Sequence, residues 1–463
     1  MYYSGNGKER NVPTLEQPGE NYIMESARLI WSKLKWGLLL VLAVLVAVFG
    51  ILQVTHQPAS IRSATQRTTA PLAGFTPAAC TLLPPETPPE FATVEFKTDF
   101  RKHCVHYDEI LSGGPPKDGI PALDAPRLVT VNEANAWLKP DEPVIYFQVG
   151  SDARAYPIQI LIWHEIVNDT VGGVPVAVTF CPLCNTAIVF ERTVGGRVLD
   201  FGTTGRLRFS NLLMYDRQTE SWWQQAIGQA IIGQLTGTQL VSRPAAIISW
   251  ATFQSAHPGG QVLSRDTGYD RPYGQNPYQG YDNVNQSPFL YSGPPTPGVL
   301  RPMARVLIVV LGGEAVAYPF DALKKVHVVN DTVAKTGIVV LWTPGTSSPL
   351  DTDTVAGGRD VGAATVYLRT LDGQPLTFKF AGTNIVDKET GSVWDILGQA
   401  TSGQLAGKTL TPVVAVNSFW FAWAAYQPHT RVYQPGLATV NASSVTSPGI
   451  SRRWAPSGGR SHR

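Results

Sequence analysis

The hydrophobic pattern of this chain favours strands over helices. Short apolar runs alternate with Gly-containing turns, which is typical of a sheet built from hairpins. The predicted strands include Val144–Val149, Val174–Phe180, Ala187–Thr193 and Val198–Phe201. In the same region we predict short helices at Asn132–Leu138, Ile158–Ile162 and Ser249–His257. The abundance of Gly (43) and Pro (36) adds to the turn-rich character, so the fold is predicted to be mainly β, of the α+β class.

One stretch of this pattern occurs twice. Val144–Pro157 aligns without a gap on Val306–Pro319, and the same offset pairs Asn168-Asp169 with Asn330-Asp331. Asn168-Asp169 are predicted to form a turn. Farther along, the two copies realign around two Gly-Gln-Ala triplets, after the first copy has inserted six extra residues before Asp216. We therefore predict an internal duplication that forms two pseudo-symmetric β-rich units, which either stay separate or share one continuous sheet.

Composition changes divide the chain further. In order, we predict a cytoplasmic polar N-terminus (1–35), a transmembrane signal anchor (36–54), a Pro-rich stalk and lead-in (55–125), repeat unit 1 (126–263), a Tyr/Pro/Gly-rich connection (264–302), repeat unit 2 (303–436) and a disordered tail (437–463). The connection carries many aromatic residues, which predicts that it lies over the folded body.

The membrane prediction depends on Trp36–Val54, which contains 19 residues and no charge. Three basic residues between positions 28 and 35 precede it, and two between 62 and 67 follow it, which favours an inside N-terminus. A cleaved signal peptide is the alternative, but no small-x-small cleavage site follows closely. We expect a single-pass membrane protein whose main body is extracytoplasmic. The net charge of +2 gives no reason to expect nucleic acid as a partner.

The strongest chemical signal is Cys181-Pro182-Leu183-Cys184, which lies between two predicted strands at the tip of a hairpin. Its two-residue spacing brings both sulfurs to one point, so it suits a redox dithiol, half of a metal site, or a structural disulfide. The second copy has Thr343 and Thr346 at the cysteine positions. A duplicated fold needs its chemistry only once, so function is expected in the first copy.

Other polar residues of the first copy are candidates for the same site. His164 is a candidate general base or metal ligand, with Glu165 orienting it, and the second copy has Val326 in place of the histidine. With the two cysteines, His164 would complete a site for a soft or borderline metal such as Zn, Fe or Cu. The alternative is that His164 and Glu165 only form the polar end of a helix.

A third group is predicted to bind a ligand: Arg154, Arg208, Asn211 and Trp222. The arginines would bind an anion or carboxylate and the tryptophan would stack on the ligand. Solvated arginines and a core tryptophan are the common alternatives.

Three stretches carry a family resemblance: GGPPKDGIPALDAP, ARAYPIQILIWHEIVNDTVGGVPVAVTFCPLCNTAIVFER and LLMYDRQTESWWQQ. Together they resemble the family called DUF3179 over about residues 95–436. The family has no established activity. Some members resemble selenoproteins at the cysteine motif, which implies redox or soft-metal chemistry at Cys181 and Cys184. Relatives look to carry a hydroxyl residue at Cys104, which supports a disulfide between Cys104 and Cys80 that is private to this chain.

These observations lead to a ranked set of hypotheses. The first is an extracytoplasmic, membrane-anchored protein with a thiol–disulfide redox site at Cys181 and Cys184, assisted by His164 and served by a redox partner protein. The second is a metal-binding module that uses the same three residues. The third is a ligand-binding or assembly protein in which the cysteines only staple a hairpin.

Overall fold

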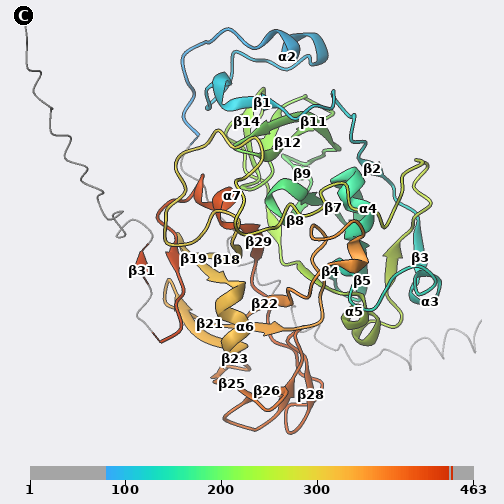
Figure 1. The fold of residues 1–463 in the computed structure, drawn as a ribbon, viewed down its shortest axis with the longest axis vertical. Coiled ribbons are helices and arrows are strands. Elements are labelled where there is room, and N and C mark those ends of the chain that lie inside the picture. Colours follow the sequence, from blue (N-terminus) through green and yellow to red (C-terminus); the bar gives the residue numbers. More distant parts are fainter. Residues whose placement is uncertain (1–79, 437–439, 442–463) are drawn as a thin grey trace, which may run out of the picture. The chain divides into compact units, whose positions relative to one another are not determined.

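The computed structural model describes residues 80–436 and 440–441 (Figure 1). The predicted membrane anchor at 36–54, the N-terminus before it, the first part of the stalk and most of the tail lie outside these residues. Within the described part of the chain, no helix is long and apolar enough to cross a bilayer. The described residues are mainly β, with a few short helices, as the sequence predicts.

Two halves of the chain begin with the same order of elements. The first half contains β4 (Pro143–Val149), β5 (Asp152–Pro157), α4 (Ile158–His164), β6 (Ile166–Val171), β7 (Val174–Cys181) and β8 (Thr186–Glu191). The second half contains β18 (Arg305–Leu311), β19 (Glu314–Pro319), α6 (Phe320–Val326), β20 (Val328–Val333), β21 (Thr336–Thr343) and β22 (Ala363–Leu368). In both halves a tight hairpin leads into a seven-residue helix and then into a second hairpin.

Each half continues with a small antiparallel sheet. In the first half it contains β11 (Phe201–Arg208), β12 (Asn211–Asp216), β13 (Trp222–Gln224) and β14 (Gln229–Ile232), and in the second half β25 (Phe378–Ala381), β26 (Asn384–Asp387), β27 (Val393–Trp394) and β28 (Ala400–Ser402). The halves then end with β16 (Ala246–Ser249), α5 (Trp250–Ala256) and β17 (Gln261–Leu263), or with β29 (Ala415–Phe419), α7 (Trp420–Ala424), β30 (Arg431–Val432) and β31 (Val440–Asn441).

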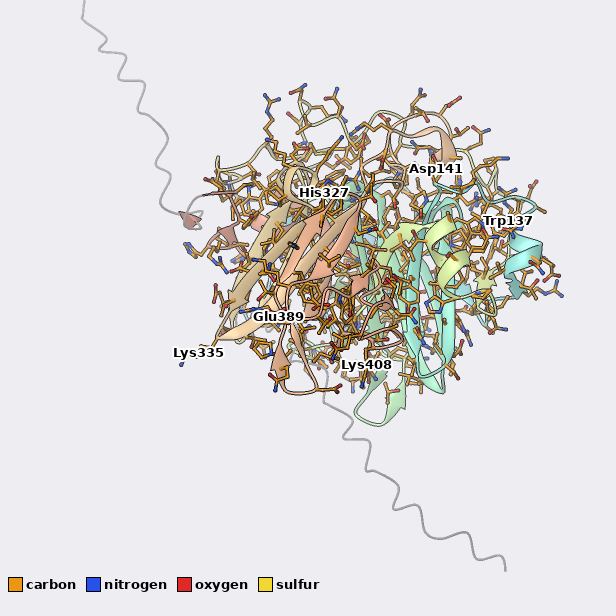
Figure 2. The ribbon with its side chains drawn as sticks, turned by 90° about the horizontal axis from the view of Figure 1, so that it is seen from below. Trp137, Asp141, His327, Lys335, Glu389 and Lys408 are labelled. Atoms are coloured by element: carbon orange, nitrogen blue, oxygen red, sulfur yellow. A yellow bond between two sulfur atoms is a disulfide. The ribbon has the colours of Figure 1, made fainter. Side chains whose placement is uncertain are left out.

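One sheet crosses from the first half into the second. Its strand order is β2-β6-β7-β8-β29-β18-β19-β30-β31, and β15 (Ser242–Arg243) also pairs with β8. The junction is the antiparallel pair of β29 with β8, at Asn417 and Ala187. Figure 2 shows strands of the two halves side by side, with His327 where β20 begins and Lys335 at the turn after β20. Strand β7 lies inside this sheet, which explains its nearly continuous run of apolar residues.

The same polar contacts recur in both halves. Asn168 bonds both the N–H and the C=O of Phe201, and Asn330 bonds the same two groups of Phe378. Asn168 and Asp169 lie within strand β6, where they pair with β7, so the predicted turn is wrong. The turn is at the two glycines that follow.

Residues 80–125 are packed on the first half, although they are predicted to be stalk and lead-in. They contain α2 (Glu90–Glu95), β1 (Ile110–Ser112), which pairs with β11, and β2 (Leu123–Asp124), which pairs with β6. A disulfide joins Cys80 to Cys104 in this segment. The folded body therefore begins no later than residue 80.

Smaller differences concern element ends. Val198–Phe201 is not one strand, because β10 (Arg197–Val198) ends before β11 begins at Phe201. Two of the predicted helices, α4 and α5, differ from the prediction by one or two residues at their ends. The third, α3, is confined to Val131–Ala134. β3 (Leu128–Thr130) pairs with β17, in the sheet that also contains the β4–β5 hairpin.

Candidate active site

The cysteine motif forms the tip of the β7–β8 hairpin. Cys181 is the last residue of β7, Pro182–Cys184 form a single 3₁₀ turn, and β8 resumes at Thr186 opposite Cys181. Asn185 closes the turn in the left-handed conformation, with φ of 50°, which asparagine tolerates well. Both cysteines are free thiols and both are buried, Cys181 with 1% and Cys184 with 0% of its surface exposed.

The surroundings of Cys181 favour a thiolate. Burial alone would raise the pKa of this thiol, but the Cys184 side chain and the backbone amides of Leu212, Cys184 and Leu183 stabilise the negative sulfur and bring the pKa below its ordinary value. Hydrogen bonds to the charged form of a group lower its pKa in this way. A thiol with a lowered pKa supplies the nucleophile of thiol chemistry at neutral pH.

Cys184 behaves in the opposite way. Burial and the adjacent Cys181 raise the pKa of Cys184 well above its ordinary value, so Cys184 holds its proton more tightly than Cys181 does. The Asn211 amide donates to Cys184 Sγ at 3.2 Å, and the Ser210 carbonyl lies 3.3 Å from the same sulfur. Asn211 is fixed in turn by Gln225 Oε1 at 3.0 Å and by the Ala226 amide at 3.0 Å.

Ser210 and Asn211 reach the cysteines because the β11–β12 hairpin is long. Both residues lie at its tip and are fully buried, and Ser210 adopts a left-handed conformation with φ of 64°. The corresponding hairpin of the second half, β25–β26, is shorter and pairs only from Phe378 to Asp387. The six extra residues of the first copy therefore build one wall of the cysteine site.

A carboxyl group lies near the thiols. Glu165 ends α4 in the left-handed conformation, with φ of 58°, and its carbonyl accepts from the Phe180 amide at 2.8 Å, next to Cys181. Burial raises the pKa of Glu165 well above its ordinary value, and a negative Cys181 raises it further. Among the described residues, its carboxyl group makes no hydrogen bond. Glu165 therefore holds its proton more tightly than an ordinary glutamate does.

His164 faces away from the cysteines. Its Nδ1 lies 2.7 Å from the Pro121 carbonyl and its Nε2 lies 2.6 Å from the Tyr273 hydroxyl. Burial lowers the pKa of His164 to about 4, so the ring is neutral, and its proton lies on Nδ1, where the carbonyl accepts it. Within the described residues no hydrogen bond joins it to either cysteine, so it is Glu165 that the structure brings to the thiols.

Arg154 lies in β5 and contacts β6, away from the end of β7 that carries Cys181. It donates to Asp169 at 2.7 Å and to Asp152 at 2.8 Å, and Tyr156 donates to the same Asp169 oxygen at 2.7 Å. In the second half, Arg431 supplies the equivalent guanidinium. Arg154 thus belongs to a buried ion-pair network rather than to the cysteine site.

Arg208 and Trp222 are also committed to structural contacts. Arg208 pairs with Glu109 at 2.6 Å, and its guanidinium lies over the rings of Phe209 and Tyr426. Trp222 packs edge-on against Phe96, at a centroid distance of 4.8 Å, in the core below the lead-in segment. Of the four predicted ligand-binding residues, Asn211 is the one that contacts a cysteine.

The metal hypothesis requires three converging ligands. In the part of the chain that the structure describes, no group of three or more His, Cys, Asp and Glu side chains is placed to hold a metal ion. The set of Cys181, Cys184 and His164 is not assembled, because both nitrogens of His164 are engaged elsewhere.

Three tyrosines complete the surroundings and were not predicted. Tyr278 and Tyr281, from the connection, pack against the core cluster that contains both cysteines, and Tyr426 donates to the Arg208 carbonyl at 3.0 Å. Burial is the main reason that the pKa of each is raised, with negative charge on the cysteines contributing. The tyrosine-rich composition of the connection was the available signal, but composition does not say which residues it covers.

Comparison with known protein families adds one finding. A family model described as "Protein of unknown function (DUF3179)" matches residues 117–430, which is more than half of the chain and includes both halves. The chain belongs to the DUF3179 family. Comparisons with curated proteins and with solved structures gave no match. For this DUF3179 protein, arguments about function therefore come from the geometry of the site.

Proposed function

We propose that this protein is a membrane-anchored, extracytoplasmic thiol–disulfide oxidoreductase whose dithiol is Cys181 and Cys184. One observation carries the proposal: the two thiols are adjacent and free, and their pKa values shift in opposite directions. That combination gives one nucleophilic sulfur and one resolving sulfur at neutral pH. Selenocysteine at this motif in relatives, which the family resemblance implies, is consistent with such chemistry.

The first step consumes a disulfide of the substrate. The Cys181 thiolate attacks one sulfur, a Cys181–substrate mixed disulfide forms, and the substrate S–S bond breaks. The departing sulfur takes the proton of Glu165, which is the nearest carboxylic acid in the site. As the negative charge on Cys181 disappears, one of the causes that raise the Glu165 pKa disappears with it, which favours this proton transfer.

The second step closes the cycle. The Glu165 carboxylate accepts the Cys184 proton, and the Cys184 thiolate attacks Cys181 Sγ. The Cys181–Cys184 disulfide forms, and the second half of the substrate leaves as a thiolate. In total, the protein loses two electrons and the substrate disulfide gains them, while Glu165 ends protonated as it began. In this proposal Glu165 takes the acid–base role that the sequence assigns to His164.

Two finer proposals accompany this one. We infer that the halves arose by duplication, because the aligned sequences coincide with corresponding elements and with the repeated Asn168 and Asn330 contacts. We also infer that residues 36–54 anchor the body outside the cytoplasm. The Cys80–Cys104 disulfide supports that compartment, since such bonds persist where the environment is oxidising.

A trapping experiment tests the redox proposal. The Cys184→Ser variant, incubated with a small disulfide such as 2,2′-dithiodiethanol, should accumulate a mixed disulfide on Cys181 that mass spectrometry detects, and the matched Cys181→Ser variant should not. The wild-type protein should instead form the internal disulfide. No adduct on either variant would refute the proposal, and stoichiometric metal that is lost from a Cys181→Ser/Cys184→Ser protein would establish the metal hypothesis in its place.

A further inference from the structure

A segment of the connection lies over the cysteine site. Residues 273–291, which we call the cover, contain no helix or strand, yet Tyr273, Tyr278, Tyr281 and Tyr291 all pack against the core cluster of Cys181 and Cys184. Tyr273 is bonded to His164, and the Tyr281 ring lies 6.2 Å from that of Phe419. The thiols are buried within this packed cluster, to which the cover belongs.

The cover is held by the half that lacks the cysteines. In the first half four residues join β7 to β8, but in the second half residues 344–362 join β21 to β22. We call residues 347–362 the bracket. Backbone bonds run from Asn276 to Asp353, from Gly280 to Asp351, and from Val355 to Gly274, at 2.8, 2.8 and 2.9 Å.

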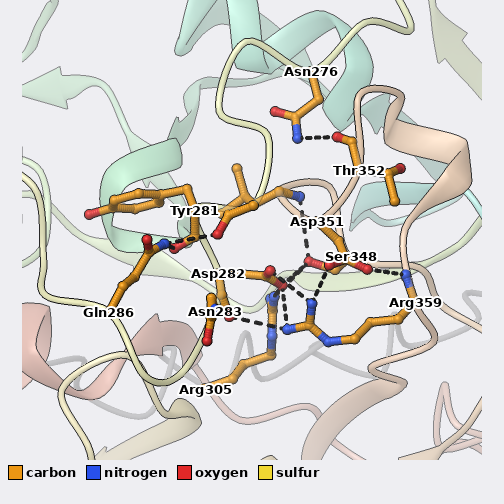
Figure 3. A network of polar contacts seen from close by, with 12 residues as sticks. Asn276, Tyr281, Asp282, Asn283, Gln286, Arg305, Ser348, Asp351, Thr352 and Arg359 are labelled. Atoms are coloured by element: carbon orange, nitrogen blue, oxygen red, sulfur yellow. Dashed lines mark hydrogen bonds and ion pairs between the residues drawn. The ribbon is translucent and has the colours of Figure 1, made fainter.

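The strongest link between them is a buried ion cluster around Asp282 (Figure 3). The Asp282 side chain is 1% exposed, and it accepts from Arg359 at 2.9 Å and from Arg305 at 3.3 Å. The Ser348 hydroxyl also donates to it, and Arg359 reaches on to Asp351. A buried carboxylate with two arginine partners is costly to break, because each group left behind would be an unpaired charge.

The position of the bracket gives its role. It is inserted at the tip of the β21–β22 hairpin, where the first half carries its cysteines. Tyr281 and Asp282 are consecutive residues. Tyr281 packs against the core cluster of the cysteines, whereas Asp282 belongs to the ion cluster that includes the bracket. Any movement that releases Asp282 therefore also moves Tyr281.

We propose that the second half clamps the cover over the dithiol through Asp282, so that the substrate of this site is a small disulfide and not a disulfide on the surface of a folded protein. This inference rests on the proposed redox function and narrows it. A protein disulfide would have to reach a sulfur with 1% exposure, which requires the cover to open. A small disulfide needs only a local opening of a few side chains.

Thiol alkylation of the full-length protein tests the inference. Cys181 and Cys184 are the free cysteines, so adducts need no further assignment. One reagent is iodoacetamide, and the other is a maleimide that carries a long polyethylene glycol chain. The test variant is Asp282→Asn. The matched control is Asp331→Asn, which disturbs a partly buried carboxylate paired with Arg431 in the second half, away from the cover.

In the wild-type protein, iodoacetamide should modify the thiols slowly and the polymer reagent should modify them far more slowly. Asp282→Asn should accelerate the polymer reagent by on the order of tenfold or more, a change that corresponds to about 1.4 kcal/mol in the free energy of local opening. Asp331→Asn should leave the ratio of the two rates unchanged.

Equal rates for the two reagents in the wild-type protein, or equal effects of the two variants, would overturn the clamp. These results do not depend on redox turnover, because alkylation needs only a reachable thiol. Failure of the mixed-disulfide trap together with the expected alkylation pattern would instead overturn the proposed function and leave the clamp in place. If Asp282→Asn does not fold, Arg359→Lys keeps the charge and breaks the two-pronged contact, and it should shift the ratio in the same direction.

Discussion

The repeated asparagine contact allows one substitution to be compared in two environments. Asn168 is 2% exposed and ties β6 to the start of β11, the strand that carries Ser210 and Asn211 toward the cysteines. Asn330 makes the same pair of bonds in the second half, but its own side chain is exposed. We expect Asn168→Ala to destabilise the protein much more than Asn330→Ala.

The expected difference follows from what each substitution leaves behind. Asn168→Ala removes bonds of 2.8 and 3.0 Å to the Phe201 C=O and N–H, and a third of 2.8 Å to Asp124. Phe201 is fully buried, so two backbone groups lose their partners, at about 1–3 kcal/mol each. The sum is about 2–6 kcal/mol. For Asn330→Ala, water can reach the exposed position and replace the amide, so the loss is about 1 kcal/mol.

Urea unfolding of both variants, followed by tryptophan fluorescence and circular dichroism, measures the two losses against the wild-type protein. The midpoint should fall farther for Asn168→Ala, with an unchanged slope. Phe378 is buried as Phe201 is, so equal losses, or a larger loss for Asn330→Ala, would show that the exposure of the asparagine side chain does not set the cost.

Three further predictions concern charged groups. Arg154→Met should lower the free energy of unfolding by about 3 kcal/mol in urea titrations, because it leaves the buried Asp169 short of a partner, yet it should not change the rate of thiol alkylation. Glu165→Gln should slow disulfide exchange by about a hundredfold in stopped-flow assays. In the wild-type protein we expect stability to fall as pH rises from the ordinary glutamate range through the raised Glu165 pKa, because the folded protein holds that proton more tightly than the unfolded chain. Glu165→Gln should remove this loss. His164 gives the opposite slope: its folded pKa of about 4 is below the ordinary 6.5, so acid from pH 6.5 to 4 should cost up to about 3 kcal/mol of stability in urea titrations, and the loss should be absent in His164→Gln.

Local patterns in the sequence predicted the elements that carry the site. The alternation of apolar runs and glycines located β4, β7 and β8, and the CxxC spacing between two strand-like runs identified a hairpin tip. These features depend on neighbours within a few residues, so periodicity and turn chemistry suffice to read them. The comparison of the two copies also marked Cys181 and Cys184 as the positions to examine.

The identity of the carboxyl group beside the thiols required the tertiary structure. His164 and Glu165 are adjacent in sequence, but the left-handed residue at the end of α4 turns their side chains to different surroundings. A histidine is the usual choice for a base, so chemistry alone pointed to His164 with Glu165 orienting it, whereas the structure bonds both ring nitrogens of His164 to groups other than the cysteines. The tyrosines of the cover were missed for a related reason, since irregular segments have no periodicity from which their contacts can be inferred.

Arg431 shows how contacts can move between positions. In the sequence, Val316 occupies the place of Arg154 in the second half. In the structure Val316 pairs with Arg431 on the neighbouring strand β30, and this arginine reaches Asp331 at 3.2 Å. An aligned position can therefore lose a residue while the folded protein retains its charge from another strand.

The pairing of β29 with β8 has a consequence for how this family can change over time. The hairpin that carries the cysteines does not end in an open edge, because a strand from the half without thiols continues its sheet. Deleting that half would leave β8 without a partner around Ala187, because β15 pairs only with Val189 and Phe190, and an unpaired strand edge is a template for aggregation. The half without thiols is therefore constrained in two ways: its strand β29 closes the sheet beside β8, and its residues Arg305, Ser348 and Arg359 hold Asp282.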